Sequence, residues 1–403
     1  MTDGLSVTNR QGVHVVPAVL GALCLVSLMS LTGCGGSSSS SATARVESIL
    51  YSFKGGTADG SGSQAGLTQA SDGNFYGTTL TGGTYGNGTA FKLTPAGVET
   101  LLWSFGGTGD GASPQAGLIQ ASDGNFYGTT TGGGRANNAG TAFKLTPAGV
   151  ETVIWSFGGT SNDGANPATG LIQASDNNFY GTTTNGGIHG SGTVFKLTPA
   201  GVESVLWSFG GTGDGAYPQA GLIQASDGNF YGTTKDGGTR GYGTVFKLTP
   251  AGVGTVLWSF GGTGDGAWPF ASLIQASDGS LYGTTNIGGA NNAGTVFRLT
   301  LAGVETVLWS FGGASDGASP WAGLIHASDG NFYGRTQGGG VNNTGTIFRL
   351  TPGGAETVLH SFGRNDTSDG TGPFAGLIQA TDGKLYGTTI GGGANLNGTV
   401  FKY

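Results

Sequence analysis

The feature that most constrains this 403-residue chain is a unit repeated seven times. A Ser-Phe pair ends an apolar run in each copy, at Phe53, Phe105, Phe157, Phe209, Phe260, Phe311 and Phe362, with spacings of 52, 52, 52, 51, 51 and 51 residues. This period is far longer than one coil of a β-helix, and no copy carries the i, i+3, i+4 apolar pattern of helical repeats. The repeat unit is therefore expected to consist of β-strands.

Each copy contains four short apolar runs separated by turn residues. In the second copy these runs cover residues 117–121, 125–130, 140–145 and 150–157. Asp123-Gly124 separates the first two runs and favours a type I′ hairpin turn, in which both central residues have positive φ. The third copy has Asp176-Asn177 there, and Asn tolerates that conformation. Each copy is predicted to be a four-stranded antiparallel meander, with strands a, b, c and d.

Both faces of this predicted sheet are apolar. Phe126 and Tyr127 are neighbours in one strand, as are Ile154 and Trp155 in another, so their side chains point to opposite faces. Such a sheet needs cover on both sides, which packing of similar sheets around an axis provides. The prediction is an all-β, seven-bladed β-propeller with four-stranded antiparallel blades.

One position in strand d carries a large aromatic ring in nearly every copy, which indicates packing between neighbouring blades. The residues at this position are Tyr51, Trp103, Trp155, Trp207, Trp258, Trp309 and His360. We interpret His360 as a stacking substitute rather than a ligand, because no other His is near it in sequence.

The two ends of the repeat region are complementary fragments of one blade. The region begins with a lone strand d, Arg45 to Phe53, and ends with strands a, b and c between Gly376 and Tyr403. The N-terminal strand is therefore predicted to complete the last blade, a 1+3 closure that leaves no exposed sheet edge.

In five copies a basic residue of strand c is followed seven positions later by an acid of strand d. The pairs are Lys92 with Glu99, Lys144 with Glu151, Lys196 with Glu203, Arg298 with Glu305 and Arg349 with Glu356. This spacing predicts that the two charges face each other across the hairpin. By the same reasoning, Lys402 should face Glu47 in the closing blade.

Composition narrows the classes of partner. The formal net charge is -7, and the 16 basic residues never cluster, so nucleic acid is not an expected partner. Two Cys exclude a disulfide scaffold and a Cys-rich metal site. No cofactor and no metal site are predicted.

The N-terminus carries the pattern of an export signal. Residues 15–31 are almost wholly apolar, like the h-region of a secretory signal, and Leu31-Thr32-Gly33-Cys34 resembles the lipobox of bacterial lipoproteins. We expect a signal peptide at 1–33, lipidated Cys34 with a Gly/Ser tether at 34–44, and the repeat domain at 45–403. The exported chain would then be anchored in a membrane through Cys34, on the periplasmic or cell-surface side. An uncleaved anchor or a chance Cys is the alternative.

The b–c and d–a loops lie at one end of a meander and are long, Gly-rich and varied, so ligand contacts are expected there. Residues just before strand a, the innermost strand, should surround the mouth of the central channel. The candidate ligand-binding residues of these loops are Tyr217, Trp268, Phe270, Trp321, Phe374, His189, Arg240 and Tyr242. Aromatic surfaces with polar neighbours suit sugars or peptides. Alternatively, these side chains simply fill the channel.

Every d–a loop also contains Asp-Gly, with the acid at Asp59, Asp110, Asp163, Asp214, Asp265, Asp316 and Asp369. We expect each Asp to accept hydrogen bonds from the backbone of its own turn. A ring of carboxylates that attracts a cation such as calcium is the alternative.

The repeat combines GLIQASDGNFYGTT (residues 221–234), GTVFKLTPAGV (residues 243–253) and a closing Trp-Ser-Phe. It resembles the GloVer tandem repeat of bacterial surface proteins that carry differing anchors, over residues 45–403. The resemblance implies a propeller-like exported protein and supplies no catalytic residue. The Asp-Gly-Asn hairpin is also similar to the strands of NHL-type propellers.

The sequence contains no Gly-x-Ser-x-Gly, His-Glu-x-x-His or phosphate-loop motif. We therefore expect a non-enzymatic binding or interaction module for peptide, protein or glycan. The alternative is a propeller enzyme, a carbohydrate lyase or a hydrolase of the lactonase type, acting at the channel mouth. A third is structural display with a filled channel. An enzyme would need two or more titratable groups that converge, whereas a binding module would not.

Overall fold

The computed structural model describes residues 47–313, 315–363 and 369–403, all within one unit of the chain, Arg45–Tyr403. The predicted signal peptide, lipidated Cys34 and tether lie outside the described residues. Across these ranges the secondary structure consists of strands without helices, which confirms the all-β prediction. The same ranges contain no helix long and apolar enough to span a bilayer.

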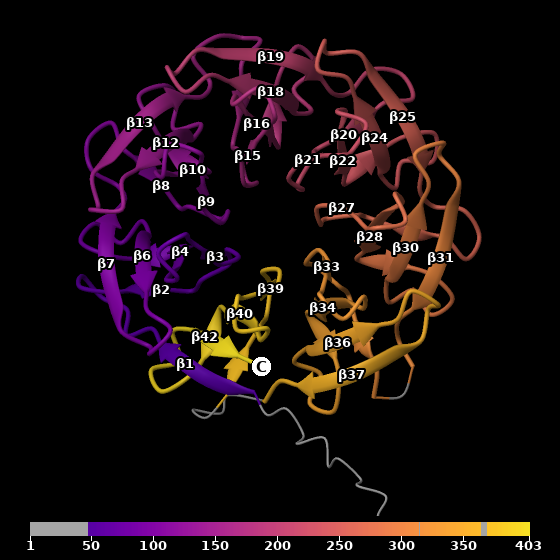
Figure 1. Ribbon diagram of the computed structural model, residues 1–403. Coiled ribbons are helices and arrows are strands. Elements are labelled where there is room, and N and C mark those ends of the chain that lie inside the picture. The colour runs from indigo at the N-terminus through magenta and orange to yellow at the C-terminus, as the bar shows by residue number, and fades with distance from the viewer. Residues whose placement is uncertain (1–46, 314, 364–368) are drawn as a thin grey trace, which may run out of the picture. The chain divides into compact units, whose positions relative to one another are not determined.

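The described strands of the unit form seven four-stranded sheets arranged as the blades of a ring (Figure 1). Within each blade the neighbouring strands run antiparallel, as in the second blade. The shortest strands lie nearest the centre and the longest lie at the rim (Figure 1). The predicted seven-bladed propeller is confirmed.

Four strand positions recur in every blade. The innermost strands, a, are β3 (Thr68–Gln69), β9 (Ile119–Gln120), β15 (Ile172–Gln173), β21 (Ile223–Gln224), β27 (Ile274–Gln275), β33 (Ile325–His326) and β39 (Ile378–Gln379). The second strands, b, are β4 (Phe75–Thr79), β10 (Phe126–Thr130), β16 (Phe179–Thr183), β22 (Phe230–Thr234), β28 (Leu281–Thr285), β34 (Phe332–Thr336) and β40 (Leu385–Thr389). The third strands, c, are β6 (Thr89–Leu93), β12 (Thr141–Leu145), β18 (Thr193–Leu197), β24 (Thr244–Leu248), β30 (Thr295–Leu299), β36 (Thr346–Leu350) and β42 (Thr399–Lys402). The outer strands, d, are β7 (Glu99–Ser104), β13 (Glu151–Ser156), β19 (Glu203–Ser208), β25 (Gly254–Ser259), β31 (Glu305–Ser310), β37 (Glu356–Ser361) and β1 (Ser48–Ser52).

Each repeat also contains a two-stranded ribbon that the sequence analysis treated as loop. It pairs the end of the d–a loop with the start of the b–c loop. The ribbons are β2 (Gly60–Ser61) with β5 (Thr81–Gly82), β8 (Gly111–Ala112) with β11 (Gly132–Gly133), β14 (Gly164–Ala165) with β17 (Asn185–Gly186), β20 (Gly215–Ala216) with β23 (Asp236–Gly237), β26 (Gly266–Ala267) with β29 (Ile287–Gly288), β32 (Gly317–Ala318) with β35 (Gly338–Gly339), and β38 (Gly370–Thr371) with β41 (Gly391–Gly392). Each ribbon thus joins a d–a loop to a b–c loop at the same end of the propeller.

The last blade is completed by the first strand of the chain. Its order is β1-β42-β40-β39, and β1 pairs with β42 in the register Ser48 with Lys402 and Ile49 with Phe401. Figure 1 shows indigo β1 beside yellow β42 at the outer edge of this blade. The predicted 1+3 closure is confirmed.

Apolar clusters join neighbouring blades. Between the second and third blades, the rings of Tyr127 and Phe179 lie 4.1 Å apart, and those of Phe157 and Phe195 lie 5.0 Å apart. Trp155 packs against this cluster, which confirms the inter-blade role predicted for its position. Equivalent clusters lie at the other six junctions. Burial of each such side chain contributes about 1.5–3 kcal/mol, so these clusters are the main source of ring stability.

The a–b turn differs from the predicted type I′ turn. Gly73 has φ 79° and donates its N–H to the carbonyl of Ala70, whereas Asp72 keeps a negative φ. The residue at the Gly position of the third copy, Asn177, has φ 63°. The loop is therefore a three-residue connection, a turn followed by one left-handed residue. The predicted hairpin is correct, but its turn type is wrong.

The predicted ion pairs across the c–d hairpin are also wrong. Leu93 lies opposite Glu99, and Lys92 lies opposite Thr100. Because neighbouring residues of a strand point to opposite faces, Lys92 and Glu99 lie on different faces of the sheet. The basic side chain instead reaches the acid of the a–b turn, Asp72.

This alternative ion pair recurs around the ring. Its members are Lys92 with Asp72 (3.0 Å), Lys144 with Asp123 (3.1 Å), Lys196 with Asp176 (3.0 Å), Lys247 with Asp227 (3.2 Å), Arg298 with Asp278 (3.0 Å) and Lys402 with Asp382 (3.4 Å). Lys402 therefore contacts Asp382 rather than the predicted Glu47. Lys247, whose repeat has Gly254 in place of Glu, forms the same pair, so the acid of strand d plays no part in it.

Candidate functional site

A cavity of about 530 Å³ lies at the loop-bearing end of the ring, and all seven blades line it. One position of the repeat supplies a lining residue from every blade; it directly follows the Pro of the d–a loop in six copies and Ser63 in the first. These residues are Gln64, Gln115, Ala168, Gln219, Phe270, Trp321 and Phe374. Because each d–a loop leads into the innermost strand, this position faces the ring axis in each copy.

Three consecutive blades place aromatic rings at this position. Phe270 and Trp321 stack with centroids 4.2 Å apart and an interplanar angle of 11°, and Trp321 meets Phe374 edge-on at 5.7 Å. All three side chains are only partly buried, so ring surface remains accessible in the cavity. We call Phe270, Trp321 and Phe374 the aromatic arc.

The other side of the cavity is lined by carboxamides. Gln64, Gln115 and Gln219 stand at the same repeat position as the aromatic arc, and Ala168 stands between two of them in blade order. We call the three Gln the amide arc. These Gln were not among the residues predicted from the sequence, although they occupy the same repeat position as the predicted aromatic residues. Within the described residues, the lining contains no Asp, Glu, His, Lys or Arg.

The residue just before each Pro is held in a left-handed conformation. Tyr217 has φ 54° and Trp268 has φ 56°, values that are uncommon for bulky side chains. Backbone hydrogen bonds impose this conformation, because the N–H of Trp268 donates to the carbonyl of Tyr242 at 3.0 Å and the carbonyl of Trp268 accepts from the N–H of Asn286 at 3.0 Å. Each d–a loop is thus fixed between two b–c loops, which presents the following lining residue rigidly.

A charged pair lies beside the aromatic arc. Lys235 Nζ is 5.8 Å from the ring centroid of Trp268 and 5.9 Å from that of Phe270, and it lies 3.7 Å from the carboxylate of Asp236. Trp268 therefore adjoins the cavity through Phe270 and Lys235 without lining it. The cation–π contacts hold the ammonium group near the edge of the site.

The remaining predicted residues lie away from the cavity lining. Tyr217 is 39% exposed, and Tyr242 is 46% exposed and lies over Gly261, which follows an outer strand. Arg240 approaches Gly262, and His189 approaches Gly210 in the same way. The structure thus brings together Phe270, Trp321 and Phe374, whereas His189, Arg240 and Tyr242 lie toward the outer strands of the same end.

The Asp-Gly acids of the d–a loops organise the junctions between blades. Asp110 accepts hydrogen bonds from the N–H groups of Gly106 (3.2 Å) and Gly111 (2.6 Å), as predicted, and from the indole N–H of Trp103 at 3.1 Å. The next outer strand brings Glu151 close to this Asp. Burial and, to a smaller extent, the charge of Asp110 together raise the pKa of Glu151 from 4.5 to about 8. A second acid therefore meets each Asp wherever the outer strand begins with Glu.

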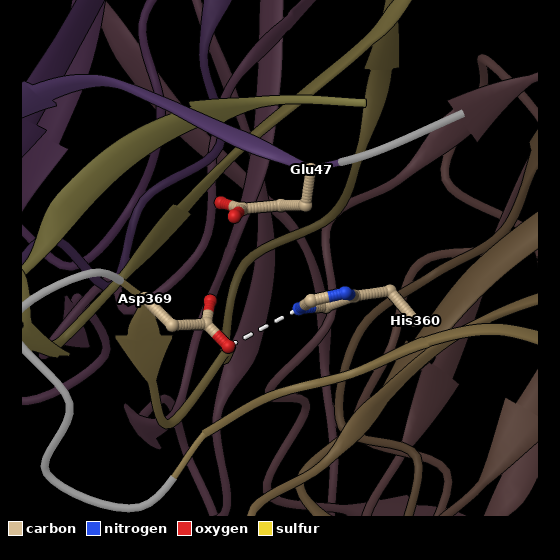
Figure 2. Close-up of side chains that lie close together, drawn as sticks. All are labelled: Glu47, His360 and Asp369. Carbon is tan, nitrogen blue, oxygen red and sulfur yellow. Dashed lines mark hydrogen bonds and ion pairs between the residues drawn. The ribbon is translucent and has the colours of Figure 1, made fainter. Parts of the chain in front are cut away.

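One junction places a histidine among these acids. His360 Nε2 lies 3.2 Å from Asp369 Oδ2, and the Glu47 carboxylate lies on the side of the group where Asp369 lies (Figure 2). Donor atoms of the three residues all lie within 4.8 Å of one another. It is the one group of this kind found among the described residues.

Fold and site together define a seven-bladed repeat propeller with a loop-lined cavity at one end of its ring axis. The chain belongs to the Gloeobacter/Verrucomicrobia repeat family, whose profile matches residues 21–226 and 212–401. This match confirms the resemblance to the GloVer repeat. Among the curated proteins, none matches the chain.

Solved structures similar to this chain are propellers of diverse kinds. Virginiamycin B lyase from Staphylococcus aureus has a TM-score of 0.58 and 13% identity, covering 89% of this chain and 97% of that one. A streptogramin B lyase has a TM-score of 0.55 and 17% identity, covering 84% and 91%. The extracellular domain of a putative hybrid two-component system from B. thetaiotaomicron has a TM-score of 0.56 and 8% identity, covering 88% of this chain and 40% of that one. At these identities the similarity shows the fold alone.

Proposed function

We propose that the protein is an exported, lipid-anchored binding module that takes a neutral polar ligand, a glycan, in the cavity on the ring axis. The observation that carries the proposal is the division of one repeat position into an aromatic arc and an amide arc. Sugars have an apolar face formed by C–H groups and a rim of hydroxyl groups. The aromatic arc would stack on that face, and the amide arc would exchange hydrogen bonds with the hydroxyls.

The chemistry of the lining favours recognition over catalysis. General acid–base or nucleophilic catalysis needs titratable groups within reach of the reacting bond, and the described lining offers carboxamides, hydroxyls and rings. The cavity, at about 530 Å³, lies in the usual range for small-ligand sites.

A propeller enzyme of the lyase or lactonase type remains the second candidate. The observation that favours it is the Lys235–Asp236 pair beside Trp268, which supplies titratable side chains near the aromatic arc. Such an enzyme would need these two groups to reach a ligand held in the cavity. A Lys235→Met variant separates the two candidates, because it would abolish turnover of an array ligand but leave glycan affinity within about twofold.

The binding proposal is tested on a glycan array probed with the purified protein, followed by calorimetry on the ligand found. A Phe270→Ala, Trp321→Ala double variant should weaken binding about tenfold or more, since both rings line the cavity and aromatic anchors carry much of the energy of such sites. Tyr85→Ala is the matched control, because Tyr85 is 58% exposed on a b–c loop and does not line the cavity. Unchanged affinity in the double variant would refute the site, and retention of peptides instead of glycans would refute the ligand class.

A further inference from the structure

The seven blade junctions repeat one arrangement with a single substitution. In each junction, the Asp of the d–a loop lies between two residues of neighbouring outer strands. One is the ring-bearing residue of the preceding outer strand, and the other is the residue at the start of the following outer strand. The trios are Tyr51/Asp59/Glu99, Trp103/Asp110/Glu151, Trp155/Asp163/Glu203, Trp207/Asp214/Gly254, Trp258/Asp265/Glu305, Trp309/Asp316/Glu356 and His360/Asp369/Glu47. Only the closing junction replaces the aromatic hydrogen-bond donor with imidazole, a group that can also bind metal ions.

The closing junction is built to hold its Asp in place. Asp369 Oδ1 accepts a hydrogen bond from the N–H of Gly370 at 2.7 Å, and Oδ2 accepts one from the N–H of Gly363 at 2.6 Å. The His360 ring packs edge-on against Phe362, with centroids 4.9 Å apart. Both side chains are largely buried, at 22% and 13% exposure. The two potential ligands are therefore oriented before any ion arrives.

The third side chain brings an unsatisfied oxygen to the same point. Glu47 Oε1 is buried and has no hydrogen-bond partner among the described residues. Figure 2 shows its carboxylate on the side of the group where Asp369 lies, and donor atoms of Glu47, His360 and Asp369 lie within 4.8 Å of one another. Two carboxylates this close repel each other unless a proton or a cation lies between them.

We propose that Glu47, His360 and Asp369 form a binding site for a divalent transition-metal ion of the Zn²⁺ type. Imidazole and carboxylate ligands bind Zn²⁺ at about 2.0–2.2 Å, which separates adjacent tetrahedral ligands by about 3.3 Å. The distance of 3.2 Å between His360 Nε2 and Asp369 Oδ2 matches this separation. Glu47 completes the set by a small side-chain rotation, and water fills the open position.

The donor set distinguishes Zn²⁺ from the harder cations. Calcium takes six to eight oxygen ligands, and magnesium keeps a nearly octahedral shell of oxygens and waters. One imidazole nitrogen and two carboxylates offer too few oxygens for calcium and a nitrogen that magnesium does not favour. The ion would also neutralise the charges of the two carboxylates.

The site would link the two ends of the ring. Glu47 precedes β1, which closes the last blade, whereas His360 lies in β37 of the preceding blade. An ion held by both strands binds the folded ring and not the unfolded chain, so it stabilises the closure. At saturating Zn²⁺ the melting temperature should rise by about 3–8 °C.

The test uses the full chain without an affinity tag, freed of metal by a chelator and titrated with ZnCl₂ in a calorimeter. We expect one equivalent to bind and the melting temperature to rise, with little response to CaCl₂ or MgCl₂. His360→Trp, which installs the residue of five other junctions, should abolish both effects while the protein stays folded. Glu47→Gln should weaken binding about tenfold or more, and Glu99→Gln, the same change at a junction without His, should not.

A gain-of-site variant makes the test independent of any loss of folding. Trp309→His places imidazole beside Asp316 and Glu356, so the variant should bind two equivalents of Zn²⁺. Zn²⁺ binding that survives His360→Trp, or stoichiometry unchanged by Trp309→His, would overturn the proposal and mark the ion as adventitious. The outcome is independent of glycan binding, because none of the three residues lines the cavity.

Discussion

At the scale of single residues, the glutamates are the most informative feature. The sequence contains six, and each stands at the start of an outer strand beside the Asp of the preceding d–a loop. In all six, one carboxyl oxygen is buried without a hydrogen-bond partner among the described residues. Burial therefore favours the protonated form, and the neighbouring Asp adds to the effect.

Glu151→Gln is predicted to stabilise the protein at high pH. Burial and the charge of Asp110 raise the pKa of Glu151 from 4.5 to about 8, so its stabilising contribution is complete below about pH 4.5 and is lost as the pH rises through about 8. The amide removes that loss. Because the carboxyl is partly exposed, we expect a gain of about 1–2 kcal/mol at pH 9 and none at pH 4, measured by urea unfolding.

Asp123→Asn provides the opposite pH dependence as a contrast. Partial burial raises the pKa of Asp123, but hydrogen bonds from Asn125, Tyr127 and Lys144 outweigh this and lower it to about 2. Its contribution is present above about pH 4 and disappears as the pH falls toward 2. The Asn variant should therefore be less stable than the parent at pH 7, and their stabilities should converge near pH 2. Parallel pH profiles for the two variants would contradict both assignments.

At the scale of elements, the N-terminal strand has more influence than its five residues suggest. β1 supplies the outer edge of the last blade, and Phe53, directly after it, is fully buried in the cluster between the last and first blades. Loss of this segment would expose the edge of β42 and leave a cavity in that cluster.

Removal of residues 1–53 is predicted to lower the melting temperature by about 10 °C or more relative to removal of residues 1–44, because loss of Phe53 alone costs about 3–5 kcal/mol. It should also promote association through the unpaired edge of β42. Scanning calorimetry and light scattering measure the two effects. Equal melting temperatures for the two truncations would refute the closing role of β1.

The elements also show what could be predicted from the sequence. The four strands were predicted because each apolar run is bounded by turn residues, but the register of the c–d hairpin was one residue off. The loop has three residues, 147–149, one fewer than a pairing of Lys144 with Glu151 would need, and Gly149 ends it with φ 85°, so Leu145 faces Glu151. The proximity of Glu47 and His360 was missed although the closure was predicted, because the predicted register placed Glu47 opposite Lys402, whereas Ser48 holds that position.

At the scale of the whole molecule, the ring brings the residue at one repeat position of all seven blades together around the cavity. The aromatic arc was predicted, because Phe270, Trp321 and Phe374 precede the innermost strands. The amide arc was missed because Gln is common in polar loops. Its role becomes visible only when the ring places the three Gln across the cavity from the aromatic arc. The proposed anchor belongs to this scale as well, since it would hold the entire ring at a membrane.

Cys34→Ala is predicted to release the protein from the membrane fraction of the expressing bacterium, because a thioether-linked lipid can no longer form. The melting temperature of the released protein should equal that of the parent, since all described strands lie between Ser48 and Lys402. Fractionation with immunoblotting measures the distribution. A Cys34→Ala protein that still sediments with membranes would refute lipidation at this residue.

The equivalent apolar clusters at the seven blade junctions allow one blade to take the place of another. Because each blade meets its neighbours through an equivalent apolar cluster and contributes its own residues to the cavity lining, recombination between repeats can replace a blade without disturbing the ring. Such an exchange alters the part of the lining that one blade supplies and leaves the other blades intact. A gene built from such repeats can therefore generate a family of mosaic rings whose cavity linings differ blade by blade.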